Sequence, residues 1–502
     1  MNKLLIAVLH LLTFTQLCNL AMAQEAPDAR LFTFKAVIQL AREQSPKYRY
    51  AAVLFENRQW QYKTYRSNYF PQLKLNGTLP DYSKTIEPRL TDSGSLIFIN
   101  THNASSSMQL SLGQEIWPTG GYISINSQMK RIDDFQSDFN RTRYSSVPAI
   151  VTLSQPLFAF NNRAWDRKIS PLRYEEAKRD YWEEMEDISK EATSHFFNLL
   201  LSQIGFQIAE KNVANNDTLY KIASERFETG KIPENELLQM ELTLLNSVQN
   251  LDQAKLDMEA NTLKLKMFLG ITDDYPIELI PPSTIPEFEV DETVALEQAR
   301  RNRRQIIGFK RELLEAEMRM AKAKGETGFN ANLFASFGLT QQALEIQEAY
   351  YDPSQQQRVR VGFNVPIMDW GRDAAILGTA KANQTLVKAN VELQRTNFDQ
   401  EIYLHVKRFK VLRKQMAGAK RADEIAEKRY KITKVRYLDG LIGILDLNVA
   451  TEERDKASRS YISALRNFWH AYYTLRGLTL YDFETNQPLL AEVDQTFTAQ
   501  TN

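Results

Sequence analysis

Two patterns of apolar and polar residues alternate along this chain of 502 residues. Some stretches carry apolar residues at the three-and-four spacing of an amphipathic helix, whereas shorter ones alternate apolar and polar residues one by one. The helical pattern predicts six helices, at residues 33–69, 164–228, 234–269, 291–323, 373–438 and 444–475. The two longest, with about 65 residues each, would measure on the order of 95 Å, so they need packing partners along their whole length.

The strictly alternating stretches predict half-buried β-strands between these helices. Residues 330–339 and 358–367 place apolar side chains at every odd position, and similar runs begin at Leu73 and at Val151. A further pair of alternating runs within residues 108–129 flanks a turn and predicts an extra hairpin. The pattern leaves open whether this hairpin joins the other strands or folds beside them. Polar segments at residues 81–95, 134–143 and 341–357 are predicted to be loops.

The order of predicted elements occurs twice, which indicates a tandem duplication. Gln155-Pro156-Leu157-Phe158 has a counterpart 210 residues later at Val365-Pro366-Ile367-Met368. Arg226-Phe227-Glu228-Thr229-Gly230 recurs at the same spacing as Arg436-Tyr437-Leu438-Asp439-Gly440. The predicted domains are a first repeat at 24–270, a proline-rich linker at 271–290, a second repeat at 291–477 and a polar C-terminal tail at 478–502.

Residues 1–23 have the features of a secretory signal peptide. A positive charge at Lys3 precedes an apolar run to about Leu17, and a small-residue cleavage motif ends at Ala23. The only cysteine, Cys18, lies within this segment, so we expect the exported chain to have no disulfide bonds. After this segment, no run of about eighteen apolar residues predicts a membrane-spanning helix.

Composition and motifs argue against several classes of function. The chain has 62 Lys and Arg against 62 Asp and Glu, whereas a nucleic-acid partner requires a basic excess. Motifs of nucleotide-binding, zinc-hydrolase and serine-hydrolase sites do not occur in the sequence. His195 and His405 occupy equivalent positions in the two repeats, but neither has a second His or a Cys at ligand spacing. We therefore expect no catalytic residues, no cofactor and no metal site.

Aromatic residues cluster where predicted strands meet helices, as they do at a lipid–water interface. They are Tyr69, Phe70, Phe158, Phe160, Trp165 and Trp370. In a membrane, the strands of one chain are too few to close a barrel, whose smallest size is about eight strands. An open sheet edge cannot face lipid, so this interpretation requires several copies of the chain. The rival interpretation is a periplasmic coiled-coil scaffold or adaptor with a small β domain and no pore.

The order and spacing of these features resemble the TolC-like outer-membrane efflux family over nearly the whole exported chain. Besides the duplication, the likeness rests on Tyr69-Phe70-Pro71-Gln72-Leu73 at the entry to the first strand and on Gln155-Pro156-Leu157-Phe158 at the end of another. It rests further on Trp370-Gly371-Arg372 before the second long helix and on the two glycine-bearing motifs at Arg226–Gly230 and Arg436–Gly440.

The resemblance implies a mainly α fold with a membrane β-barrel. Three copies would form a 12-stranded barrel, or an 18-stranded one if the extra hairpin joins it, which continues into a long periplasmic α-helical barrel. The implied function is the exit duct of a tripartite efflux or type I secretion system. A homotrimer in outer-membrane lipid would passively conduct substrates from an inner-membrane pump of the RND or ABC type, joined through a periplasmic membrane-fusion adaptor.

The resemblance also implies roles for residues at the helix ends. Asp446 and Glu236 would form a pore constriction, although an acidic residue at a helix N-terminus is also favoured by the helix dipole alone. In some members a salt-bridge latch involves a basic residue that falls at Ile442 and an acidic one at Val449, so the latch stays an open question here. The tip that docks the adaptor would comprise Arg226, Phe227, Gly230, Arg436, Tyr437 and Gly440.

Overall fold

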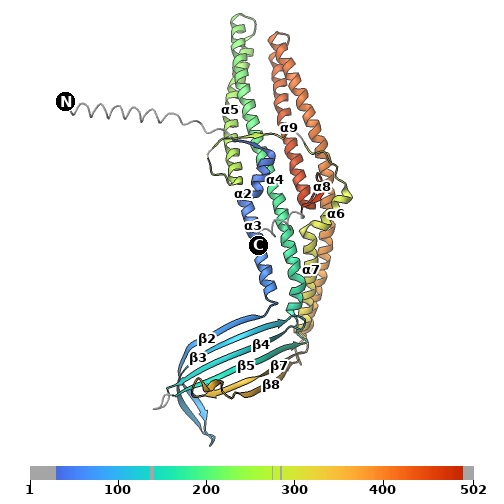
Figure 1. The fold of residues 1–502 in the computed structure, drawn as a ribbon. Helices are drawn as coiled ribbons and strands as arrows, with labels where there is room; N and C mark the ends of the chain where they lie inside the picture. The colour runs from blue at the N-terminus through green and yellow to red at the C-terminus, as the bar shows by residue number, and fades with distance from the viewer. Residues whose placement is uncertain (1–29, 136–140, 274, 283–284, 490–502) are drawn as a thin grey trace, which may run out of the picture. The chain divides into compact units, whose positions relative to one another are not determined.

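The computed structural model describes residues 30–135, 141–273, 275–282 and 285–489 (Figure 1). The predicted signal peptide and the end of the predicted tail, residues 490–502, lie outside the described residues. The chain forms two compact units. The first contains the N-terminal part up to Val53, Asp180–Arg303 and the chain from Asp399 onward, and the second contains Leu54–Arg179 and Arg304–Phe398.

Two pairs of long helices dominate the fold (Figure 1). They are α4 (Asn162–Glu228) with α5 (Glu234–Leu269), and α8 (Arg372–Leu438) with α9 (Ile444–Thr479). The members of the second pair have the same lengths as those of the first, 67 and 36 residues, and follow them by the same 210 positions. The four helix spans predicted from periodicity therefore agree with the structure to within a few residues. None of the helices in the described part of the chain is long and apolar enough to cross a membrane.

The two shorter helical segments differ from the prediction, because each is broken into two helices. Residues 33–69 form α2 (Phe34–Gln44) and α3 (Pro46–Ser67), and the second repeat forms α6 (Glu292–Asn302) and α7 (Arg304–Glu326). Each break is one extended residue, Ser45 or Arg303. A residue before proline disfavours the helical conformation, which explains the break at Ser45. Arg303 is not followed by proline, so its break has no such local signal.

The first unit has a core rich in aromatic residues. Phe34 of α2 packs on Phe196 and Phe197 of α4 and on Trp469 of α9, with ring centroids 4.9–5.5 Å apart. Two short sheets extend this core: β1 (Arg30–Thr33) pairs in parallel with β6 (Ile277–Ile280), and β9 (Tyr481–Asp482) pairs with β10 (Gln487–Pro488). Parts of the predicted linker and tail are thus packed, with buried side chains at Ile277, Leu279, Leu480, Phe483 and Leu489.

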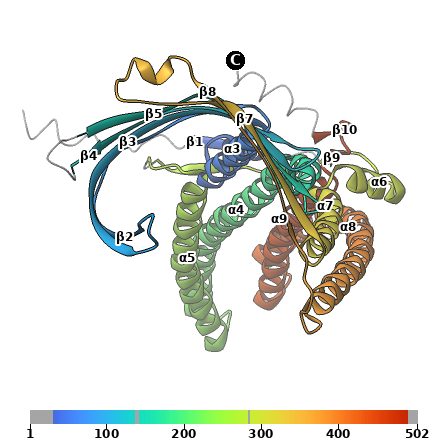
Figure 2. The same cartoon turned by 90° about the horizontal axis from the view of Figure 1, so that it is seen from below.

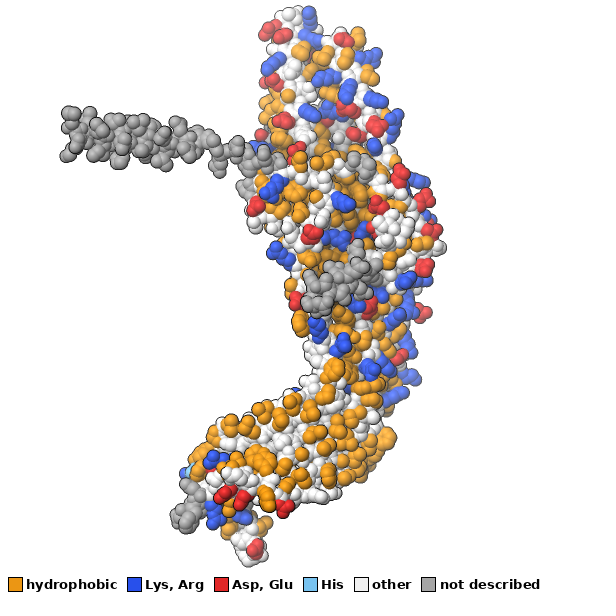
Figure 3. Space-filling model, in the orientation of Figure 1, with side chains coloured by type: hydrophobic (Ala, Val, Ile, Leu, Met, Phe, Trp, Pro, Cys, Tyr) orange, Lys and Arg blue, Asp and Glu red, His pale blue; other side chains and the backbone are white. Residues whose placement is uncertain are grey.

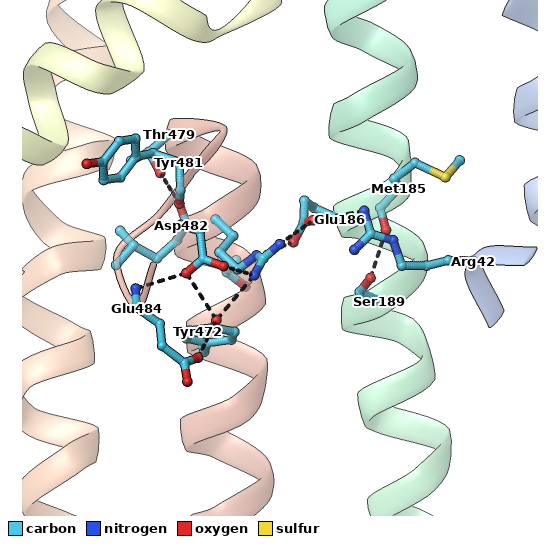
Figure 4. Close-up of polar contacts among 12 residues, drawn as sticks. Arg42, Met185, Glu186, Ser189, Tyr472, Thr479, Tyr481, Asp482 and Glu484 are labelled. Carbon is cyan, nitrogen blue, oxygen red and sulfur yellow. Dashed lines mark hydrogen bonds and ion pairs between the residues drawn. The ribbon is translucent and has the colours of Figure 1, made fainter. Parts of the chain in front are cut away.

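A buried charge network crosses this core (Figure 4). The side chain of Glu186, on α4, is fully buried and accepts from Arg476 of α9, whose Nε lies 3.0 Å from Oε2. Arg42 of α2 lies 3.4 Å from the other carboxylate oxygen. Arg476 also contacts Asp482 of β9 at 2.7 Å and donates to the hydroxyl of Tyr472. The network therefore joins the N-terminal helix, both repeats and the C-terminal hairpin.

The second unit contains one antiparallel sheet of six strands in the order β2-β3-β4-β5-β7-β8 (Figure 1). The extra hairpin predicted within residues 108–129 is the pairing of β3 with β4, in the middle of this sheet. The first repeat contributes four strands and the second contributes two, joined where β5 pairs with β7. The strands are β2 (Gln72–Leu90), β3 (Leu96–Ile116), β4 (Gly121–Asp134), β5 (Arg141–Leu157), β7 (Asn330–Ala343) and β8 (Ser354–Asn364).

The hairpin of β2 and β3 extends well beyond its neighbours. Its strands have 19 and 21 residues, whereas β4 pairs with β3 only as far as Asn103, opposite Asp134. The prediction of a loop at residues 81–95 is wrong for most of its length, because β2 continues to Leu90. A register shift between Thr78 and Asp81 interrupts the alternation of apolar and polar residues. The continuation of the strand beyond Thr78 was therefore not recognised from the sequence.

Candidate functional site

The turns after the two long helices share one backbone geometry. Gly230 and Gly440 have φ of 68° and 74°, in the left-handed region. After α4 the amide of Gly230 donates to Phe227, and that of Lys231 donates to Arg226. After α8 the corresponding amides of Gly440 and Leu441 donate to Tyr437 and Arg436. Each repeated motif therefore encodes a Schellman-type helix end, in which glycine takes the left-handed position.

We expect Gly440→Ala to destabilise this helix end by about 1–2 kcal/mol, because a Cβ strains a left-handed backbone. Gly443→Ala is the matched control: Gly443 has φ of −78°, and no atom lies within 4 Å of the place that an added Cβ would take. Hydrogen exchange at the last turn of α8 would measure the difference. Equal protection in both variants would contradict this role for Gly440.

The structure brings several predicted tip residues together. Tyr437, on α8, is buried in a cluster with Leu219 of α4 and Met240 of α5. The guanidinium carbon of Arg226 lies 5.9 Å from the centre of the Tyr437 ring. Burial raises the pKa of Tyr437, the charge of Arg226 lowers it, and the charge of Glu236 raises it. Arg226, Tyr437 and Glu236 thus form one neighbourhood that joins the ends of the two repeats.

The remaining predicted residues lie around this neighbourhood. Asp446 is exposed in the first turn of α9, and Glu236 is half-buried in the first turn of α5. Neither helix has a side-chain cap, because Pro233 and Gly443 precede them. Phe227 and Arg436 are exposed. Both acidic residues are therefore placed where a helix dipole favours a negative charge, and Asp446 is also open to solvent.

Ile442 and Val449, the positions to which the resemblance assigns a latch in some family members, are both apolar in this chain. Ile442 packs against the buried cluster that contains Tyr437, and Val449 is partly exposed. A polar link between the repeats occurs nearby, where Lys434 Nζ donates to Asn215 Oδ1 at 2.9 Å. The contacts between the two helix ends therefore include apolar packing, the cation–π contact of Arg226 with Tyr437, and the hydrogen bond from Lys434 to the uncharged side chain of Asn215.

A polar groove of about 1270 Å³ runs between the helices of the first unit. Its walls come from α4, α5, α8 and α9. Amide side chains dominate the lining, and such groups exchange hydrogen bonds with water and with many solutes. The lining includes Asn212, Asn246, Asn250, Gln253, Asn448 and Asn467. This composition suits a wall that passes polar solutes better than a site that recognises one ligand.

One wall of the groove contains a contact that the sequence did not reveal. Asn212 of α4 donates to Asp455 of α9 at 2.8 Å and accepts from Arg454 at 3.2 Å. Arg454 also pairs with Asp455 at 2.5 Å, and it lies 4.1 Å from the ring centre of Tyr430. Because the partners come from different repeats, no local pattern could have predicted this link.

The six-stranded sheet has one apolar and one polar face. Cross-strand pairs such as Leu73 with Leu112, Leu75 with Leu110 and Leu333 with Val361 lie on the apolar face. Many of these side chains are exposed, and apolar side chains gather over the sheet in Figure 3. The other face presents small polar residues, including the row Gly113, Ser124, Thr152 and Ser336.

The sheet is curved, and its apolar face is convex. The segment between β7 and β8, which contains η1 (Glu348–Tyr350), lies on the convex side (Figure 2). The hydroxyl of Ser146 donates to the carbonyl of Ala349 in that segment. Ser146 pairs with Met129, which belongs to the apolar face by register. The concave face is therefore the polar one.

Three of the six aromatic residues predicted to lie at the strand–helix junctions are exposed, and the other three, Tyr69, Phe160 and Trp165, are half-buried. Phe70, Phe158 and Trp370 are exposed, and Phe158 lies 5.7 Å from Phe329, measured between ring centres. Phe158 and Trp370 have positive φ values of 69° and 55°, which are strained for these residues. Within the described residues, no group of three or more His, Cys, Asp or Glu could hold a metal ion.

Comparisons with known proteins agree with this architecture. The family model of the outer membrane efflux protein matches residues 37–271. A search of the curated proteins gives no match. The outer membrane channel CmeC of Campylobacter jejuni has a TM-score of 0.65 at 17% identity, covering 92% of this chain and 88% of that chain. VceC of Vibrio cholerae has a TM-score of 0.60 at 13% identity, covering 89% of this chain and 95% of that chain.

The open-state MtrE channel of Neisseria gonorrhoeae is similar at a TM-score of 0.57 and 16% identity, covering 89% of this chain and 88% of that chain. At these identities the likeness concerns the fold. The chain thus shares its fold, which combines long helices with an antiparallel sheet, with solved outer membrane channels, and residues 37–271 also match the family by sequence.

Proposed function

Since this chain belongs to the outer membrane efflux protein family, a family of non-enzymatic channels that extend from the outer membrane into the periplasm, we propose that it is the exit duct of a tripartite export system. The duct is a homotrimer. It receives substrates from an inner-membrane pump of the RND or ABC type through a periplasmic membrane-fusion adaptor. Efflux and type I secretion both use this arrangement.

The open six-stranded sheet is the observation that carries this proposal. Among the described residues, its outermost strands, β2 and β8, each pair with a single neighbouring strand. The exposed apolar face suits lipid, but unpaired strand edges cannot remain in a bilayer. Closure by neighbouring copies satisfies both edges. Three copies of six strands give an 18-stranded barrel, a size that leaves a water-filled channel.

Exposed apolar stripes on the long helices support self-association as well. On α8, Leu404, Val411, Ile425 and Ile432 are exposed and repeat in steps of seven or fourteen residues. On α5, Leu242, Leu256 and Leu263 are exposed at the same periodicity. A heptad stripe that faces solvent is a coiled-coil surface without its partner. A second copy of this chain offers the matching stripe.

We assign adaptor docking to the tip, which comprises Arg226, Phe227, Gly230, Arg436, Tyr437 and Gly440. The exposed ring of Phe227 and the exposed guanidinium of Arg436 are the groups available to a partner. Gly230 and Gly440 shape the turns, and Tyr437 joins them through its buried ring. The constriction belongs to Asp446, with Glu236 in a lesser role because its side chain is half-buried.

Single-channel recording tests the constriction. Three Asp446 carboxylates on one axis attract multivalent cations most strongly, since Coulomb attraction grows with the charge of the ion. We expect Asp446→Ala to weaken block by hexamminecobalt(III) on the order of tenfold. Glu236→Ala should have a smaller effect, and Glu228→Ala, which removes an exposed carboxylate at the end of α4, is the control. Equal block in wild type and Asp446→Ala would show that Asp446 does not form the constriction and only stabilises the N-terminus of its helix.

A further inference from the structure

The concave face of the sheet carries basic side chains along the same stretch of the strands in which the convex face is apolar. Lys74 lies on β2, Lys130 on β4, and Arg358 and Arg360 on β8. The register places all four on the polar face: Lys74 pairs with Ser111, and Arg358 pairs with Ser336. Lys74, Arg358 and Arg360 are exposed, and Lys130 is half-buried.

The described strand residues that share cross-strand rows with these four charges offer no carboxylate that is free of another basic partner. Among the described strand residues that lie in the same cross-strand rows as these four, Glu115 is the one carboxylate. Its Oε1 accepts a hydrogen bond from Nη2 of Arg163 on α4, at 2.6 Å. The remaining acidic residues of this face lie farther along the strands, where basic residues balance them. They are Asp81, Glu87 and Asp134, accompanied by Arg89, Arg141 and Arg143, of which Arg143 pairs with Asp134 at 3.5 Å.

None of the four basic residues forms an ion pair with any residue that the structure describes. Arg360 lies over the ring of Phe334, with its guanidinium carbon 5.5 Å from the ring centre. Phe334 pairs directly with Arg360 on the neighbouring strand. A cation–π contact holds the side chain in place without neutralising its charge. The face between the helix junction and the distal hairpin is therefore positively charged.

We propose that this basic face, formed by Lys74, Lys130, Arg358 and Arg360, makes the barrel section selective for anionic solutes. The inference rests on the proposed function, because the concave face lines a lumen only when copies of the chain close the barrel. It adds the chemical class of the favoured solute. Anions gain favourable interactions with four basic groups from each copy, while cations are repelled.

The effect is measurable but depends on salt. A barrel of this size leaves an aqueous channel, so an ion passes basic groups at a distance of several ångströms through water. The Debye length is about 10 Å at 0.1 M salt and about 3 Å at 1 M. The contribution of the basic face to anion permeability acts in series with the attraction of the Asp446 ring for cations. It should therefore be largest in dilute salt and fade in concentrated salt.

Reversal potentials across planar bilayers under a potassium chloride gradient test the proposal. The double variant Arg358→Gln/Arg360→Gln should lower the chloride-to-potassium permeability ratio about two- to fivefold near 0.1 M salt. Lys84→Gln is the control for charge outside the lumen, because it removes a positive charge from β2 on the opposite face of the sheet. It should leave the ratio unchanged. Near 1 M salt, wild type and double variant should converge.

The outcomes separate this inference from the proposed function. A conducting channel whose permeability ratio is the same in wild type and in the double variant overturns the anion-selective lumen and leaves the channel intact. An equal change in the Lys84→Gln control also overturns it, since the effect would then not come from the concave face. If the wild-type protein gives no conductance under any condition, the proposed channel function is contradicted, and the anion-selective lumen is contradicted with it.

Discussion

Replacing Glu186 with glutamine is expected to lower the free energy of unfolding by about 3–5 kcal/mol, the usual cost of removing one partner from a buried ion pair. The side chain of Glu186 is fully buried between Arg42 and Arg476, and Arg476 is itself largely buried. In the variant, Asp482 remains as a carboxylate partner of the Arg476 guanidinium. The partly uncompensated charge then destabilises the core of the first unit.

Urea titration of the helical circular dichroism signal in detergent would measure the loss. Asp187→Asn is the matched control, because Asp187, the next residue along α4, is exposed and pairs with the half-buried Lys190. Exposed pairs of this kind contribute about 0–1 kcal/mol. Limited proteolysis gives a second readout, since release of Arg476 should also loosen the β9–β10 hairpin that Asp482 anchors. Similar midpoints for both variants would contradict a role for Glu186 in stability.

The double substitution Ile425→Asp/Ile432→Asp is expected to prevent assembly of the trimer. Both side chains lie in the exposed heptad stripe of α8, and burying one such side chain contributes about 1.5–3 kcal/mol. Each trimer would lose six apolar side chains and would have to bury six carboxylates in their place, which is costly without partners. Because the stripe faces away from the core of its own chain, the monomer should keep its helical content.

Native mass spectrometry of the detergent-solubilised protein checks this expectation. Wild type should give a trimer and the double variant a monomer. Lys420→Asp, at an exposed polar position on the same helix, is the control and should remain trimeric. A wild-type protein that is monomeric and needs no detergent would instead support the periplasmic scaffold. A variant that stays trimeric would show that α8 contributes little to the interface.

The sequence by itself determined the helical framework and the duplication. The predicted ends of the two long helices at residues 228 and 438 coincide with the observed ends, because a glycine at position 230 or 440 provides a local stop signal. Helical periodicity and capping act within a few residues along the chain, so they can be read without knowing the fold. Strand positions were predicted less completely, since the alternation is broken at the register shift near Thr78.

Only the tertiary structure decided which elements pair. Because the β3–β4 hairpin lies inside the sheet, the sheet has six strands. The alternation of apolar and polar residues in this hairpin would be the same if it folded outside the sheet, so the sequence pattern could not decide between the two. Arg226 meets Tyr437, Asn212 meets Asp455 and Glu186 meets Arg476 across more than 200 residues of chain. That Arg358 and Arg360 have no acidic partner among the described residues likewise depends on which residues share their cross-strand rows. Such contacts arise from the packing of distant segments, so no local periodicity records them.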